Sequence, residues 1–238
     1  MQLIILAAGT GSRLRSLTKK KPKSLIKIKN TCIVDYQLNQ FKNLKVKKII
    51  VVVGFASKLI KKKLGKKLKY IVNKKYRTTN NIYSLWLARK FLKEETIITF
   101  SDLVMDKNIP KKLIKSKKNF TLAIDTSKIL NGTMKIKVKN KELLAIGKSV
   151  KNNADGNFIG AAKIKKSKIK QFRTYLSKIV LSKKKDYYTE VFNYLIAKKN
   201  TINFIDVKNS FWAEVDDHHD LKKLNKKMQS ANIYKSIT

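Results

Sequence analysis

Apolar and polar positions along the first hundred residues define two alternating kinds of segment. Short segments rich in apolar and β-branched residues, typical of buried strands, occupy residues 3–7, 48–53, 68–72 and 96–100, and the first of them is apolar throughout. Apolar residues at helical spacing occupy the intervening segments 34–44, 58–64 and 82–92. Strand and helix in strict alternation predict a parallel sheet with helices on both faces.

The rest of the chain has a different pattern. Short strands separated by Asn, Gly and Lys turns are predicted at 120–124, 134–138, 143–146 and 158–162, and they indicate an antiparallel addition. Later elements are predicted as helices at 169–181, 187–198 and 219–228 and strands at 202–207 and 211–215. The expected fold class is therefore α/β: a mostly parallel central sheet flanked by helices, with a small antiparallel addition. Two prolines and no Ser/Gly-rich stretch favour one domain over residues 1–238.

The charge first suggests nucleic-acid binding. Lys and Arg number 56 against 15 Asp and Glu, a net charge of +41, while 43% hydrophobic residues exclude a disordered basic tail. Only five of the basic residues are Arg, the side chain that reads bases and phosphates bidentately, and the lysines are spread along the whole chain. Lys, Asn and Ile also share A/T-rich codons. Compositional bias is therefore favoured over a nucleic-acid surface, although the charge still attracts nucleotides.

Three further absences limit the class of protein. Cys32 is the single cysteine, so there is no disulfide framework or Cys/His zinc motif. No apolar run is long enough to span a membrane, and the apolar start at residues 3–8 is too short for a signal peptide. A soluble, cytoplasmic protein is expected.

A glycine turn follows the first predicted strand. Residues 6–14 read LAAGTGSRL, whose small residues and two glycines let backbone N–H groups approach a phosphate. The predicted nucleotide-binding positions in this stretch are Leu6, Ala8, Gly9 and Gly11. Arg13 follows at once, and Lys23 comes after Pro22, adding a planar fork and a point charge. Neither the dinucleotide fingerprint nor the Walker sequence fits.

With Lys-Pro-Lys at 21–23, this stretch resembles the signature of the nucleotidyltransferases that join a nucleoside triphosphate to a sugar phosphate or a small phosphorylated head group. The resemblance implies a Rossmann-like, GT-A-like fold. It also implies that Gly9, Gly11 and Arg13 hold the triphosphate and that Lys23 lies against the reacting phosphates as a catalytic residue with Arg13.

Two later stretches narrow the resemblance, which runs from residue 3 to about residue 224. Residues 79–85, TNNIYSL, are similar to the Asn-rich turn of the phosphocholine cytidylyltransferase branch, which implies base or ribose contacts for Asn80, Asn81 and Ser84; helix capping is the alternative for Asn80. Ser101 and Asp102 end the strand at 96–100, and residues 211–217, FWAEVDD, resemble the late segment of that branch. We include Ser101 among the nucleotide contacts.

Acidic residues are scarce, so their grouping is informative. Glu214 and Asp216 alternate on a predicted strand and face the same side, while Asp102 lies at the edge where ligands bind in such sheets. Converging carboxylates suit Mg²⁺, so Asp102, Asp216 and Glu214 are the predicted metal residues; for Glu214, direct ligation and a supporting position behind the ligands are equal alternatives. We interpret Asp217 and Asp220 as helix-capping residues, and His218 and His219 as surface residues.

The acceptor site is less clear from the residues. An aminoalkyl or choline-like group needs aromatic faces or a carboxylate, and the candidates are Tyr83, Tyr188, Glu190 and Trp212, with Trp86 and Tyr187 as further aromatics. Core packing is an equal alternative for these aromatics.

The resulting hypothesis is a Mg²⁺-dependent cytidylyltransferase. It would transfer CMP from CTP to a small phosphorylated or phosphonate head group, with phosphocholine and 2-aminoethylphosphonate leading. One alternative is a sugar-1-phosphate nucleotidyltransferase using UTP or dTTP, and the other is a basic nucleic-acid-binding protein on a degenerate nucleotide fold. The sequence does not indicate an oligomeric state.

Overall fold

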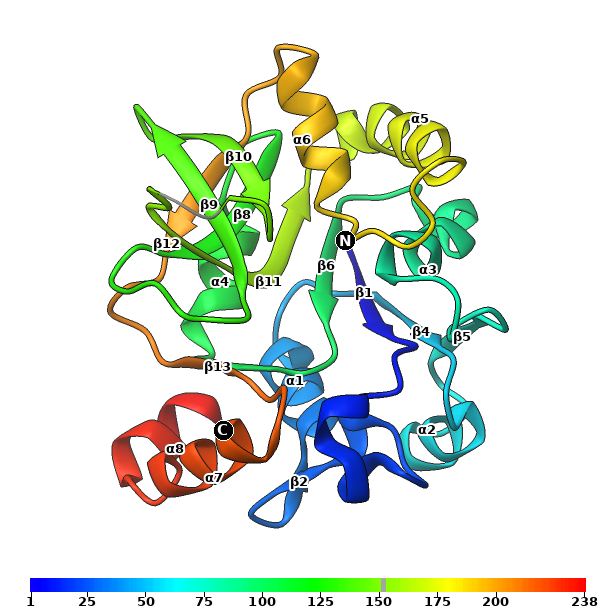
Figure 1. Cartoon of the computed structure of the whole chain (residues 1–238), viewed down its shortest axis with the longest axis vertical. Coiled ribbons are helices and arrows are strands. Elements are labelled where there is room, and N and C mark those ends of the chain that lie inside the picture. The colour runs from blue at the N-terminus through cyan, green and yellow to red at the C-terminus, as the bar shows by residue number, and fades with distance from the viewer. Residues whose placement is uncertain (151–152) are drawn as a thin grey trace.

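The computed structural model describes residues 1–150 and 153–238, and these form a central nine-stranded mixed sheet (Figure 1). The strand order across it is β5 (Lys69–Val72), β4 (Lys48–Val53), β1 (Gln2–Ala7), β6 (Thr96–Phe100), β11 (Gly156–Ile164), β8 (Phe120–Asp125), β12 (Asn203–Asp206), β10 (Glu142–Gly147) and β9 (Met134–Lys139). The first four strands run parallel. Strand β11 is antiparallel to both β6 and β8, and the antiparallel β9–β10 pair ends the sheet. The predicted α/β class, with its antiparallel addition, is confirmed.

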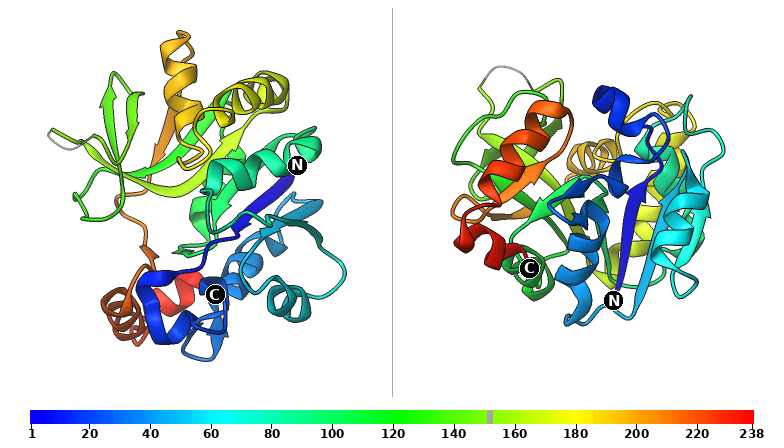
Figure 2. Two further views of the ribbon diagram at one scale, coloured as in Figure 1. Left: turned by 45° about the vertical axis from the view of Figure 1, so that its right-hand side comes forward. Right: turned by 90° about the horizontal axis from the view of Figure 1, so that it is seen from below.

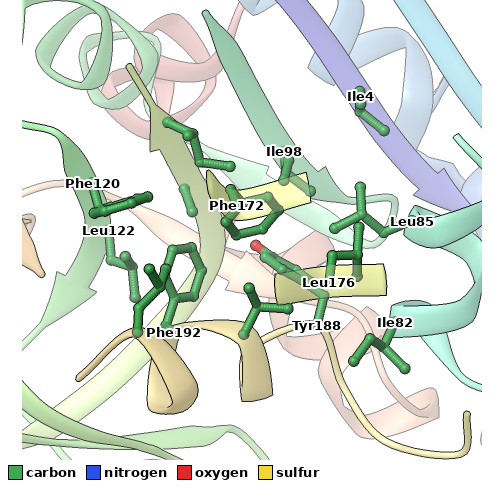
Figure 3. Packing of buried hydrophobic residues seen from close by; sticks show 14 of the residues in the cluster. Ile4, Ile82, Leu85, Ile98, Phe120, Leu122, Phe172, Leu176, Tyr188 and Phe192 are labelled. Carbon is green, nitrogen blue, oxygen red and sulfur yellow. The ribbon is translucent and has the colours of Figure 1, made fainter. Parts of the chain in front are cut away.

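The two faces of the sheet are covered by different helices, because side chains on a strand alternate between its faces. Ile4 and Leu6 of β1 belong to a buried cluster with helices α3 (Asn81–Leu87), α5 (Ile169–Val180) and α6 (Glu190–Ala197), as Figure 3 shows in part. Leu3 and Ile5 belong to a second cluster on the opposite face, with α1 (Ile33–Lys42), α2 (Ser57–Leu64) and α4 (Asn108–Lys115). Each fully buried aliphatic side chain contributes about 1.5–3 kcal/mol to this packing.

A third cluster joins the two ends of the chain. It contains Leu14 from the 3₁₀ helix η1 (Ser12–Thr18), Ile28, Val104 and Val215, and Leu224 of helix α7 (His218–Lys227). The same region holds η2 (Lys23–Leu25), the short strands β2 (Lys27–Ile28), β3 (Thr31–Cys32), β7 (Leu103–Met105) and β13 (Trp212–Glu214), and helix α8 (Ala231–Ile237). Figure 2 shows the red C-terminal helices beside the blue segment that follows β1. This packing fixes the glycine turn against the C-terminal segment.

The predicted elements are present, and two of their boundaries differ from the prediction by more than two residues. The helix expected over 82–92 ends at Leu87, and a separate 3₁₀ turn follows at Arg89–Phe91, where the Phe91 carbonyl accepts a hydrogen bond from the Gln2 side chain. The helix expected from 187 begins at Glu190, because the Tyr188 N–H donates to Asn81 Oδ1. Of the short strands in this region, β13 matches the strand expected at 211–215, whereas β2, β3 and β7 were not predicted, nor were helices α4 and α8. Among the described residues, no helix has both the length and the apolar character needed to cross a bilayer.

Trp212 and Asp125 form a buried hydrogen bond that fixes the C-terminal segment to the sheet. The indole Nε1 of Trp212 on β13 donates to Asp125 Oδ2 at the end of β8, at 2.7 Å. Burial acts to raise the pKa of the Asp125 carboxyl, but the hydrogen bonds that it accepts from Ser127 and Trp212 hold this pKa below its usual value. Asp125 is therefore ionised in the folded protein at neutral pH, and it needs its donors.

We predict that Trp212→Phe lowers the free energy of unfolding by about 1–3 kcal/mol at pH 7, because it leaves a buried carboxylate oxygen without its donor. The difference from the native chain should be complete above the usual carboxyl pKa and should shrink as the pH falls through the lower native pKa of Asp125. Urea unfolding at pH 7 and pH 3 measures both effects. Trp86→Phe is the matched control, since the Trp86 indole N–H has no carboxylate partner among the described residues; equal losses in the two variants would contradict the prediction.

Candidate active site

A cavity of about 280 Å³ lies at the carboxyl ends of β1 and β6. Each residue predicted to contact the nucleotide, the phosphates or a metal lies on its wall: Leu6, Ala8, Gly9, Gly11, Arg13, Lys23, Asn80, Asn81, Ser84, Ser101, Asp102, Glu214 and Asp216. These residues come from the two ends and the middle of the chain. The fold thus brings together what the sequence separates by two hundred positions, and it does so at the sheet edge where α/β proteins bind ligands.

The glycine turn gives the cavity an open backbone wall, and its two glycines have different roles. Gly11 has a φ of +65°, and a Cβ there would lie 3.0 Å from Lys23 Cβ and 3.1 Å from Thr18 Cγ2. Gly11 is therefore required by the fold of the turn. A Cβ on Gly9 would meet nothing within 4 Å, so that Gly9 keeps space on the cavity side free for a ligand.

Lys23 lies between two carboxylates in the cavity. Its Nζ is 2.6 Å from Asp102 Oδ2 and 2.5 Å from Asp216 Oδ1, and Arg13 Nη2 is 2.9 Å from Asp216 Oδ2. Lys23 begins η2 directly after Pro22, Asp102 follows β6, and Asp216 follows β13. Three distant segments therefore meet in one charge cluster.

The charges in this cluster stabilise one another. Burial favours the neutral amine of Lys23, yet the Asp102 and Asp216 carboxylates raise its pKa above the usual value. Burial likewise opposes ionisation of Asp216, but Lys23 and Arg13 lower the pKa of that carboxyl. Lys23 and Asp216 are therefore both charged at neutral pH.

Glu214 is in a different electrostatic state. Burial, followed by repulsion from Asp102 and Asp216, raises its pKa to about 8. Its strand β13 pairs with β7, opposite Leu103, which places it beside the Asp102 turn. Among the described residues, no three His, Cys, Asp or Glu side chains form a cluster arranged to hold a metal ion. Asp102 and Asp216 thus both contact the Lys23 ammonium, whereas Glu214 lies next to them and has no ion pair with any described residue.

The Asn-rich turn combines capping with cavity contacts. Asn80 Oδ1 accepts from the Asn81 N–H at 2.7 Å at the start of α3, so the capping alternative holds for its oxygen. Asn81 Oδ1 is used by the Tyr188 N–H, and Ser84 Oγ lies 3.0 Å from Asn73 Nδ2. The Nδ2 groups of Asn80 and Asn81 donate to no other described residue, which leaves them for a ligand. Capping is also confirmed for Asp217 and Asp220, which form a capping box on α7, and His218 and His219 are exposed.

The four acceptor predictions do not lie on this cavity wall. Tyr188 is fully buried in the core between α5 and α6 (Figure 3). Trp212 is buried and donates its indole N–H to Asp125, and Tyr83 stacks on Trp86 with ring centroids 5.4 Å apart. Glu190 lies on a neighbouring cavity, where it pairs with Lys183. Three of the four are thus packing residues, the alternative that the sequence left open.

Several wall residues were not predicted. Asn73 follows strand β5 and is buried against Thr79 and Ser84, and Tyr76 lies nearby on the wall. A polar residue directly after an apolar run at the carboxyl edge was the signal for Asn73. Met134 and Lys148 come from the antiparallel extension, whose position over the cavity has no signal in the local sequence.

The mixed sheet and a glycine turn over basic and acidic side chains define a Rossmann-like α/β protein of the phosphate-binding type. The sequence model of the nucleotidyl transferase family matches residues 2–134, and the chain belongs to that family of enzymes. It is similar to the CTP:phosphoglutamine cytidylyltransferase of Campylobacter jejuni, with 28% identity over 93% of this chain and 98% of that one. The choline-phosphate cytidylyltransferase of Haemophilus influenzae is 30% identical over 94% and 97%.

The fold has close counterparts among solved structures. The CTP:phosphocholine cytidylyltransferase of Streptococcus pneumoniae superposes with a TM-score of 0.79 at 21% identity, covering 95% of this chain and 98% of that one. This agreement confirms the fold class that the sequence predicted.

We predict that alanine substitution of the two glycines of the turn affects different properties, stability for Gly11 and ligand binding for Gly9. Gly11→Ala should destabilise the protein by at least about 1–2 kcal/mol, because a left-handed backbone disfavours a Cβ and Lys23 and Thr18 crowd it. Gly9→Ala should leave the melting temperature unchanged but weaken triphosphate binding by at least about tenfold, because the methyl group enters space that the backbone leaves open. Thermal melts and nucleotide titrations test both variants. Tight nucleotide binding by Gly9→Ala would show that the phosphates do not approach this turn.

Proposed function

We propose that this enzyme is a cytidylyltransferase that transfers CMP from CTP to a small phosphorylated or phosphonate head group and releases pyrophosphate. The observation that carries the proposal is the cluster of Lys23, Asp102 and Asp216 beneath the glycine turn. The relatives named above support CTP as the donor, and their acceptors, phosphoglutamine and choline phosphate, are small phosphorylated molecules.

The chemistry requires positioning and charge neutralisation more than a protein nucleophile. An oxygen of the acceptor phosphate forms a bond to the α-phosphorus of CTP in line with the leaving group, and the bond from that phosphorus to the bridging oxygen of pyrophosphate breaks. In this proposal Arg13, whose side chain is 57% exposed beside the turn, would bind the triphosphate, and Lys23 would lie between the donor and acceptor phosphates. Both offset the charge that develops on the leaving and attacking oxygens.

Mg²⁺ fits the carboxylate pair in this proposal. Asp102 Oδ1 is buried without a hydrogen-bond partner among the described residues, and its Oδ2 and Asp216 Oδ1 already share one cation, the Lys23 ammonium. Two carboxylates with phosphate oxygens and water are a common way to hold Mg²⁺. When bound, the ion would neutralise charge on the α-phosphate. Glu214 remains a predicted metal residue that adjoins this pair.

The Asn-rich turn is the proposed binding site for base and ribose. Asn80 and Asn81 line the cavity with side-chain amides that donate to no other described residue, and the hydrogen bond between buried Asn73 and Ser84 supports the turn. Amide donors match the carbonyl oxygen that cytosine shares with uracil. These donors do not distinguish the two bases, so the preference of the enzyme for CTP over UTP or dTTP is decided by the assay below.

We expect Asp102→Asn to lower kcat by at least about 10²-fold, because it removes one of the two carboxylates that hold the cation. Pyrophosphate release should be measured with each nucleoside triphosphate, with a panel of phosphorylated acceptors, and with and without Mg²⁺. CTP with a small phosphorylated head group and Mg²⁺ should give the highest rate.

Glu94→Gln is the matched control, because Glu94 lies at the opposite end of β6 and its side chain is 47% exposed. This variant should keep native activity and melting temperature, and circular dichroism should show that Asp102→Asn is still folded at the assay temperature. Near-native turnover by Asp102→Asn would refute the carboxylate pair. A preference for UTP or dTTP with sugar 1-phosphates would refute the cytidylyltransferase proposal, and salt-sensitive DNA binding without turnover would refute the enzymatic one.

A further inference from the structure

A second cavity of about 310 Å³ adjoins the first. The two are neighbours, since Met134, Lys148 and Tyr187 line both of them. The second cavity lies between the antiparallel extension, at the start of β9 and the end of β10, and the segment that leads into α6. Its position suits the part of an acceptor that lies beyond its phosphate.

The wall of this second cavity carries both signs of charge. It includes two carboxylates, Asp186 and Glu190, and two ammonium groups, Lys148 and Lys183. Glu190 is already satisfied, since its Oε2 is 2.5 Å from Lys183 Nζ and its Oε1 accepts from Asn193. Asp186 and Lys148 have no ion pair with any described residue. Asp186 also acts electrostatically on Lys183, whose pKa it helps to raise, but the wall still holds one carboxylate and one ammonium without an ion-pair partner among the described residues.

A buried hydroxyl adds a third polar group. Thr189 lies on the wall and is 1% exposed, and its Oγ1 has no hydrogen-bond partner among the described residues. A buried hydroxyl without a partner costs free energy, and native proteins rarely leave one unless a ligand or water satisfies it. This hydroxyl can both donate and accept.

The wall is poor in aromatic surface. Tyr187 is the one aromatic side chain among the wall residues that the structure describes, and Lys148 Nζ lies 5.1 Å from its ring centroid. A trimethylammonium group is bound by several aromatic faces that replace its water shell. Here the available ring face already carries a protein cation, which opposes a second one.

From these contacts we infer that the acceptor carries an amino-acid head group at the end opposite its phosphate. Asp186 holds the ammonium, Lys148 holds the carboxylate, and the Thr189 hydroxyl adds a hydrogen bond. The inference rests on the proposed function and specifies its acceptor class. Asp186 and Lys148 are then specificity-determining residues, because each recognises one charge of a zwitterion, and a group that lacks either charge leaves a wall residue unpaired.

A panel of four acceptors with CTP tests this inference. O-phosphoserine carries both charges, phosphoethanolamine only the ammonium, phosphoglycolate only the carboxylate, and phosphocholine a methylated ammonium. The expected result is that kcat/KM for phosphoserine exceeds each of the other three by at least about tenfold. A kcat/KM for phosphocholine or phosphoethanolamine equal to or above that of phosphoserine would overturn the inference.

Two variants, each of which removes one charged group, test which residue recognises the ammonium and which recognises the carboxylate. Asp186→Asn should lower kcat/KM for phosphoserine and phosphoethanolamine by about tenfold and leave phosphoglycolate unchanged, whereas Lys148→Met should lower it for phosphoserine and phosphoglycolate only. Glu142→Gln and Lys111→Met, on exposed positions of β10 and α4, are the matched controls and should change none of these values. Unaltered acceptor selectivity in both variants would overturn the assignment while the proposed function stands. Failure of the proposed function is distinguishable, because it gives no pyrophosphate from CTP with any acceptor.

Discussion

The rest of the structure is organised around one electrostatic constraint, the pairing of the Lys23 ammonium with the Asp102 and Asp216 carboxylates. The two carboxylates lie against the same ammonium, which offsets their mutual repulsion and helps to lower the pKa of Asp216. Because the three residues follow Pro22, β6 and β13, their pairing ties the first loop of the chain to its last strand. The same arrangement that fixes the chain ends also places two oxygen ligands where a metal-bound triphosphate would need them.

The packing around the cluster serves this constraint. The third hydrophobic cluster, with Leu14, Val104 and Val215, brings the glycine turn, β7 and β13 together beneath it. Glu214 shows how much negative charge is gathered there, since its pKa rises to about 8 through burial and the neighbouring carboxylates. An apolar foundation under a charged cluster limits its exposure to water and strengthens each interaction in it.

Sequence patterns predicted the parallel half of the fold and the nucleotide wall, because both depend on local signals. Apolar runs such as 48–53 identify buried strands, and the glycine turn follows one of them directly. The order of the antiparallel strands was not predictable, since β11 enters between β6 and β8 through pairings far apart in sequence. Aromatic residues were also ambiguous. Tyr188 and Trp212 proved to be core residues because a ring that suits a ligand suits packing equally well.

The net charge of +41 raises the question of how such a protein selects among anions. A positive field of this strength attracts every phosphorylated molecule, so that it speeds encounter without discriminating. Discrimination must therefore come from short-range contacts, and in a chain this basic the scarce carboxylates are the groups that supply them. In the proposed reaction, Asp102 and Asp216 would distinguish a cation-bound phosphate from a free one, and Asp186 would distinguish an acceptor that carries an ammonium from one that does not. On this proposal, substrate choice depends on the few acidic residues of the two cavities, and the general positive field only brings the ligand to them.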